Sequence, residues 1–211
     1  MSGTPVVVVH GLWLNGLESF LLRDRMRSAG FAPDAFRYPS MHATLAEVTA
    51  ALAARLRAFE RAHVIGHSLG GVIALETLLA HEDLPPGRVV LMGAPVRGSR
   101  AARAVAHRWY GPPMLGPLAM AELARERDAR WHGTRELGVV AGTRAAGIGR
   151  VFADLPQPND GTVCLDETDL PGASARAIHE VSHTGMLLSA AVARSLVQFL
   201  ASGKFEAPAE T

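Results

Sequence analysis

The chain alternates between short runs of apolar residues and longer stretches in which apolar positions recur at helical spacing. Continuous β-branched runs such as Val6–Val9 are typical of strands that are buried on both faces of a sheet. The sequence predicts strands at Val6–Val9, within Phe31–Tyr38, and at Val64–Gly66, Arg88–Met92, Leu137–Ala141 and Ala175–His179.

Helical patterns with start and stop signals separate most of these strands. Thr44 and Glu47 form a capping box, and Gly30 and Gly203 follow the ends of two helical patterns. Because strands alternate with helices, we predict an α/β fold in which right-handed crossovers build a parallel sheet covered on both faces. The predicted helices are Gly16–Ala29, a helix from the Thr44 capping box to about Phe59, Leu69–Ala80 and Met186–Ser202.

The segment from residue 98 to residue 135 carries no strand signal. Helix-like pieces around Ala101–Arg108 and Leu118–Arg130 flank an apolar stretch at Trp109–Leu115. We predict a cap-like insertion at about 98–135, packed over the sheet of a single domain that spans residues 1–211. Acidic residues are interspersed with the arginines of its second half, which favours a solvated helix face over a surface for acidic partners.

Ser68 lies in a turn between a predicted strand and a predicted helix, in the G-x-S-x-G pattern Gly66-His67-Ser68-Leu69-Gly70. A serine in so sharp a turn has strained backbone angles, and Gly66 and Gly70 leave room for the neighbouring strand and helix. The alternative is a serine that only caps its helix. No P-loop or dinucleotide-binding pattern is present, which argues against a phosphate cradle.

A serine hydroxyl needs a base, and the base needs a carboxylate that orients it, before it can act as a nucleophile. In a doubly wound sheet these groups are expected in loops after the later strands. Asp160 lies in the loop after the Leu137 strand, and His183 follows the last strand. Two alternatives for the acid and one for the base remain, namely Asp154 or Asp166, and His179.

These motifs, together with the His10-Gly11 turn, resemble those of small α/β-hydrolases of the bacterial lipase and esterase group. The resemblance extends over nearly the whole chain and implies the α/β-hydrolase fold with a short helical cap. It implies that Ser68 is the nucleophile, His183 the base and Asp160 the orienting acid. By the same resemblance, the backbone amides of Leu12 and Leu69 would form the oxyanion hole.

The resemblance implies an esterase or lipase-like enzyme that cleaves carboxylic esters through an acyl-enzyme, without cofactor or metal. An acyl-thioesterase or acyltransferase would use the same residues, and a non-catalytic binding module is a further alternative. The substrate would be a small-molecule or lipid ester. The candidate acyl-pocket residues, which would otherwise form a small core within the cap, are Trp13, Trp109, Tyr110, Met114 and Leu115.

The composition agrees with a folded enzyme. The 211 residues are 48% hydrophobic with a formal net charge of +1, which argues against disorder and nucleic-acid binding. Cys164 is the single cysteine, so no internal disulfide forms. We find neither a secretory signal nor a long apolar segment, and therefore expect a cytoplasmic protein without stable membrane insertion. The oligomeric state is left open.

Overall fold

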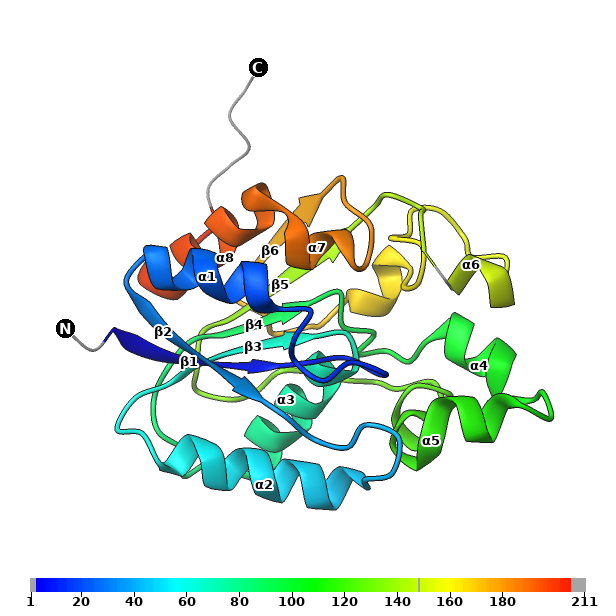
Figure 1. Cartoon of the computed structure of the whole chain (residues 1–211), viewed down its shortest axis with the longest axis horizontal. Helices are drawn as coiled ribbons and strands as arrows, with labels where there is room; N and C mark the ends of the chain where they lie inside the picture. The colour runs from blue at the N-terminus through cyan, green and yellow to red at the C-terminus, as the bar shows by residue number, and fades with distance from the viewer. Residues whose placement is uncertain (1–2, 148, 206–211) are drawn as a thin grey trace.

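A six-stranded sheet forms the middle layer of the molecule (Figure 1). The computed structural model describes residues 3–147 and 149–205. All neighbouring strands in the order β2-β1-β3-β4-β5-β6 pair in parallel, which confirms the predicted fold class. The strands are β1 (Thr4–Val9), β2 (Phe31–Phe36), β3 (His63–His67), β4 (Val89–Met92), β5 (Leu137–Gly142) and β6 (Ala175–His179).

Helices cover both faces of this sheet (Figure 1). Helices α1 and α8 lie on one face, and α2 and α3 lie on the other. Helices α4 and α5 lie beyond the carboxyl ends of the central strands. The helices are α1 (Phe20–Ser28), α2 (Leu45–Arg57), α3 (Leu69–Ala80), α4 (Arg100–Ala106), α5 (Gly111–Glu122), α6 (Gly149–Phe152), α7 (Gly185–Leu188) and α8 (Ala190–Ser202), with a 3-10 turn η1 at Leu165–Thr168.

The valines of β1 pack in both hydrophobic cores, one on each face of the sheet. Successive side chains of a strand point to opposite faces, so Val7 and Val9 pack in the core under α2 and α3, and Val6 and Val8 pack under α1 and α8. All four valines are buried. A strand in this position needs an uninterrupted apolar run, which explains the sequence pattern.

The first helix is shorter than its pattern predicts. It begins at Phe20 rather than Gly16, because residues 16–19 form a hydrogen-bonded turn. Gly16 has a φ of 90° and its N–H donates to the Glu18 carboxylate at 2.9 Å, while the Ser19 hydroxyl donates to the Gly16 carbonyl at 2.8 Å. Asn15 and Glu18 therefore stabilise a turn rather than the start of a helix.

The helices between residues 98 and 135 differ from the prediction. Helix α5 begins at Gly111, inside the stretch predicted to link two helices, and ends at Glu122. Residues 123–130 are not helical, because this segment pairs with the chain near residue 98: Ser99 N–H donates to the Leu123 carbonyl at 2.8 Å, and Arg127 N–H donates to the Arg97 carbonyl at 3.2 Å.

The last helix is also divided. Ser189 ends α7 with extended backbone angles, and its hydroxyl accepts a hydrogen bond from Val192 N–H at 3.3 Å, which caps α8. The stop signal at Gly203 agrees with the structure, where this residue has left-handed angles after Ser202. Within residues 3–147 and 149–205, no helix is both long enough and apolar enough to cross a bilayer.

Candidate active site

Ser68 occupies a strained turn at the carboxyl end of β3. Its φ of 56° and ψ of −126° lie outside the regions that non-glycine residues favour. A Cβ atom at Gly66 would collide with the Gly71 backbone, and one at Gly70 would collide with the Val9 carbonyl. The Ser68 side chain makes no capping hydrogen bond to α3, so the interpretation of Ser68 as a helix cap is wrong.

Asp160 and His183 form a buried pair in the loops after β5 and β6. The His183 Nδ1–H donates to Asp160 Oδ2 at 2.7 Å, and the His183 backbone N–H donates to the Asp160 carbonyl at 2.9 Å. The other carboxylate oxygen, Oδ1, accepts hydrogen bonds from the backbone N–H groups of Thr162 at 2.9 Å and Val163 at 2.7 Å. Asp160 is 1% exposed. The carboxylate therefore holds the imidazole with Nε2 as its free acceptor.

The alternative acid and base residues lie elsewhere. Asp154 is exposed, and Asp166 forms a bidentate ion pair with Arg100 at 2.8 Å. His179, within β6, contacts the Ser195 hydroxyl through Nε2 at 3.1 Å. Of the candidates, only Asp160 and His183 contact each other among the described residues.

An apolar cavity of about 230 Å³ connects Ser68 with His183, since both residues line it. No hydrogen bond joins Ser68 Oγ to His183 within the part of the chain that the structure describes. Gly11, Leu12 and His67 line the same cavity. A hydroxyl and an imidazole that share one cavity can exchange a proton once a substrate is seated.

The backbone amides of Leu12 and Leu69 have no hydrogen-bond acceptor among residues 3–147 and 149–205. Leu69 is the first residue of α3, where the helix leaves its N–H groups free. The turn that carries Leu12 touches the nucleophile turn, since a Cβ at Gly11 would lie 3.1 Å from Ser68 Cβ. Leu69 directly follows Ser68 in the chain, and Leu12 and Ser68 line the same cavity.

His10 fixes the turn that carries Leu12. Its ring stacks on Tyr38 with 4.2 Å between centroids, and its Nδ1–H donates to the Gly11 carbonyl at 2.8 Å. Tyr38 donates its hydroxyl to the His10 carbonyl at 2.8 Å and its backbone N–H to His10 Nε2 at 3.4 Å. Burial lowers the pKa of His10. A neutral ring with both nitrogens bonded has a structural role.

His67 and Gly93 are site residues whose importance the motifs did not reveal. The His67 Nε2–H donates to the His183 carbonyl at 3.1 Å, and the two rings lie 4.7 Å apart. Gly93 has a φ of 56°, and a Cβ there would lie 3.2 Å from His183 Nδ1. The sequence signals were a histidine beside Ser68 and a glycine at the end of the β4 strand, but neither indicates contact with His183.

Three of the five predicted pocket residues line the cavity, namely Trp13, Met114 and Leu115. The Trp13 indole N–H donates to the Met114 carbonyl at 2.7 Å and links the Leu12 turn to α5. Trp109 and Tyr110 do not line it, which corrects the prediction. Both lie in the turn between α4 and α5, where the Trp109 side chain is 90% exposed and Tyr110 packs against the edge of the core.

No group of three or more histidine, cysteine, aspartate or glutamate side chains is arranged to hold a metal ion within the described residues. The buried thiol of Cys164 is a poor alternative nucleophile, because burial raises its pKa to about 11. Ser68 is therefore the nucleophile candidate that the geometry favours.

Comparison with solved structures gives the same fold. The mature form of lipase BlEst2 from Bacillus licheniformis superposes with a TM-score of 0.74 at 19% identity, covering 95% of this chain and 91% of the lipase. The chain covers 52% of the propeptide form of that lipase. A meta-cleavage product hydrolase from Pseudomonas fluorescens gives a TM-score of 0.64 at 14% identity, with 96% and 92% of the two chains covered.

A phospholipase, PlaB from Legionella pneumophila, gives a TM-score of 0.67 at 14% identity, with 94% of this chain and 56% of PlaB covered. No curated protein matches the chain. The model of the alpha/beta hydrolase family matches residues 6–205, which include Ser68, Asp160 and His183. The chain therefore belongs to the alpha/beta hydrolase family.

Proposed function

We propose that the chain is a serine hydrolase that cleaves carboxylic esters through an acyl-enzyme. The observation that carries this proposal is the buried Asp160–His183 pair, which shares an apolar cavity with Ser68 on its strained turn. The likeness in fold to a bacterial lipase supports an ester as the substrate. Ser68 is the nucleophile, His183 the general base and Asp160 the group that orients and stabilises the imidazolium.

In the first half-reaction, Ser68 Oγ attacks the ester carbonyl carbon while its proton passes to His183 Nε2. The carbonyl oxygen becomes an oxyanion that accepts hydrogen bonds from the backbone N–H groups of Leu12 and Leu69. The C–O bond then breaks, and His183 donates its proton to the leaving alcohol. Water attacks the acyl-enzyme in the same way, which releases the carboxylic acid and restores Ser68.

The cavity favours acyl groups that are short or of medium length. Its walls are largely apolar, and Val105, Met114, Leu115 and Leu123 of the segment at 98–135 contribute to them. This contribution supports the proposal that the segment is a cap over the site of a single domain. A volume of about 230 Å³ is below the range of about 300–1,000 Å³ of typical ligand pockets, so a long chain would need the cap to move.

The test is labelling with a fluorophosphonate, read by intact mass, on the wild-type chain and Ser68→Ala. We expect one label on the wild type and none on the variant, because only an activated serine reacts. Ser189→Ala is the control, since this serine caps α8 away from the cavity. A folded wild-type chain that takes no label would contradict the proposal and favour a binding module.

Turnover of matched esters then identifies the substrate. We expect p-nitrophenyl esters from acetate to octanoate to be hydrolysed faster than the palmitate ester, because the cavity is small. Matched oxygen esters and thioesters, with and without an added alcohol as acyl acceptor, separate an esterase from a thioesterase or an acyltransferase. Faster turnover of the thioester would replace the ester proposal.

A further inference from the structure

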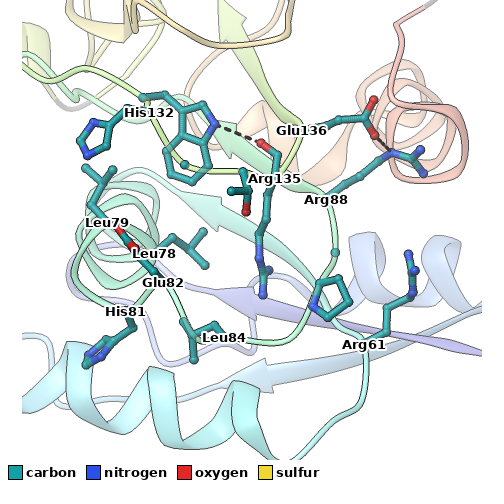
Figure 2. A pocket seen from close by; sticks show the side chains of 15 residues that line it. Arg61, Leu78, Leu79, His81, Glu82, Leu84, Arg88, His132, Arg135 and Glu136 are labelled. Atoms are coloured by element: carbon teal, nitrogen blue, oxygen red, sulfur yellow. Dashed lines mark hydrogen bonds and ion pairs between the residues drawn. The ribbon is translucent and has the colours of Figure 1, made fainter.

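A second and larger cavity lies at the amino ends of the central strands, whereas Ser68 follows the carboxyl end of β3. Figure 2 shows the residues that line it. Its volume is about 510 Å³. Its lining includes Arg61, Arg88 and Arg135, which come shortly before β3, β4 and β5, and residues from the end of α3. Parallel strands have their amino ends at one edge, so the length of β3, about 16 Å, separates this cavity from Ser68.

Of the three arginines that line this cavity, only one forms an ion pair among the described residues. Arg88 forms an ion pair with Glu136 at 2.6 Å, whereas Arg61 and Arg135 form none within the described part of the chain. Burial and then the charges of these three arginines lower the pKa of the adjacent His63 to about 4, which reflects the positive potential of the region. The remaining acid in the lining, Glu82, is exposed on the loop after α3.

Arg135 is a half-buried cation that has no ion-pair partner among residues 3–147 and 149–205. Its guanidinium donates to the carbonyl of Ala62 at 3.3 Å and to that of Pro85. A guanidinium has five N–H donors, so these bonds leave others free. Burial lowers the pKa of Arg135 to about 10. Because an unpaired buried charge is destabilising, a bound anion would be favoured here.

Leu78, Leu79 and Leu84 form an apolar side of the cavity next to Arg135. Figure 2 shows the Arg135 side chain between Leu84 on one side and the exposed Arg61 on the other, while Arg88 reaches away toward Glu136. The buried Trp131 also lines the cavity, and its indole N–H donates to the Arg135 carbonyl at 3.0 Å. The cavity thus offers a cationic end and an apolar side to the same ligand.

We propose that this cavity is a binding site for a small organic anion, a carboxylate or phosphate carried on an apolar body. The anionic group would accept hydrogen bonds from Arg135 and face Arg61, and the apolar body would pack on the leucines. The site is independent of the proposed ester hydrolysis, because none of its residues lines the cavity at Ser68.

The three tryptophans of the chain make a direct test possible. Trp131 lines this cavity, Trp13 lines the cavity at Ser68, and Trp109 is exposed. Octanoate and octyl phosphate are titrated separately into 15N-labelled protein, and the three indole N–H signals are followed. We expect a saturable shift of the Trp131 signal, and the ratio of the two affinities identifies the preferred anion. Neutral octanamide should bind about 10-fold more weakly.

The variants leave the bonds of Arg135 to Ala62 and Pro85 intact. Thr134→Glu places a carboxylate on the exposed rim of the cavity, and Arg61→Ala removes the second unpaired cation. Each substitution should lower the affinity that is measured from the Trp131 signal by about 10-fold. Ala50→Glu on the exposed face of α2 is the matched control and should change nothing.

A Trp131 signal that does not move with either anion would overturn the proposal. So would equal binding of octanamide, or full binding to Thr134→Glu. Ser68→Ala should retain the Trp131 response, so failure of this site and failure of the hydrolase proposal are separate results. A response confined to Trp13 would mean that the anions bind only in the cavity at Ser68.

Discussion

Asp160 accepts one hydrogen bond from the His183 side chain and one from the His183 backbone. Two backbone N–H groups of the following turn donate to its carboxylate and stabilise the negative charge. These contacts have different consequences for substitution. An asparagine can keep the packing and the backbone bond, but its amide group no longer stabilises an imidazolium. Catalysis should therefore depend on the carboxylate far more than folding does.

We predict that Asp160→Asn lowers kcat/KM for an accepted ester by about 1,000- to 10,000-fold, because the carboxylate orients and stabilises the protonated base. Steady-state kinetics measures the loss, and thermal unfolding checks that the fold is retained. Asp154→Asn, at an exposed position, is the matched control. Equal losses in both variants would contradict the role of Asp160.

We predict that His67 stays neutral from pH 5 to pH 8. Burial, and then the charge of His183, lower the pKa of His67 to about 3, and its Nε2–H is bonded to the His183 carbonyl. Protonation of His67 should therefore not contribute to any loss of activity within this range. Imidazole 15N shifts measured across this range test the prediction, and a His67 titration within it would contradict the buried geometry.

The sequence pattern predicts which loops form the candidate site more reliably than it predicts which side chains point into the cavity. Parallel topology places Ser68, Asp160 and His183 at one edge of the sheet, so their chain order already indicated proximity. The apolar stretch that contains Trp109 predicts a pocket residue, whereas the Trp109 side chain is exposed. Its exposure depends on the turn between α4 and α5, which residue periodicity does not define.

At the scale of elements, the end of β4 and the loop after β6 approach each other closely at Gly93. A Cβ at this position would lie 2.9 Å from Met186 Cε and 3.2 Å from His183 Nδ1. The positive φ adds backbone strain for any other residue. The element therefore needs glycine for both conformation and space.

We predict that Gly93→Ala lowers kcat by about 10-fold or more, because a methyl group displaces the His183 ring from its position. Gly30→Ala is the control for backbone strain, since Gly30 also has a positive φ but has no atom within 4 Å of the added Cβ. It should cost about 1 kcal/mol of unfolding free energy and leave kcat unchanged. Activity assays and chemical unfolding of both variants separate contact from strain.

Helix boundaries were the least predictable feature among the elements. Residues 123–130 have a helical sequence pattern, yet their backbone pairs with the chain around residue 98, and Arg127 bonds to Glu122 and Glu76. Such long-range partners override local propensity. The strands were predicted more closely, because continuous apolar runs match burial on both faces.

At the scale of the whole molecule, buried histidines connect folding to pH. Burial is the main cause that lowers the pKa of His63 to about 4 and that of His67 to about 3, both below the ordinary value of 6.5. The unfolded chain therefore binds more protons than the folded chain as the pH falls below 6.5. The stabilisation by these neutral rings is complete above 6.5 and decreases toward pH 4.

We predict that the free energy of unfolding decreases between pH 6.5 and pH 4, and that His63→Gln makes this decrease shallower. Urea unfolding at a series of pH values measures the slope. His42→Gln, at an exposed position, is the control and should leave the slope unchanged. An equal slope in the wild type and His63→Gln would show that His63 does not contribute.

The bonds between Asp160 and His183 include no atom of Ser68. The proposed acid and base therefore meet in the loops after β5 and β6, while the β3–α3 turn contributes Ser68, and His67 of β3 bonds to the His183 carbonyl. Chemistry at this edge is modular: a cysteine installed at position 68 would meet an imidazole that is already oriented. Under the proposed mechanism, we expect Ser68→Cys, which replaces one oxygen by sulfur, to place a thiol in the same cavity as this imidazole.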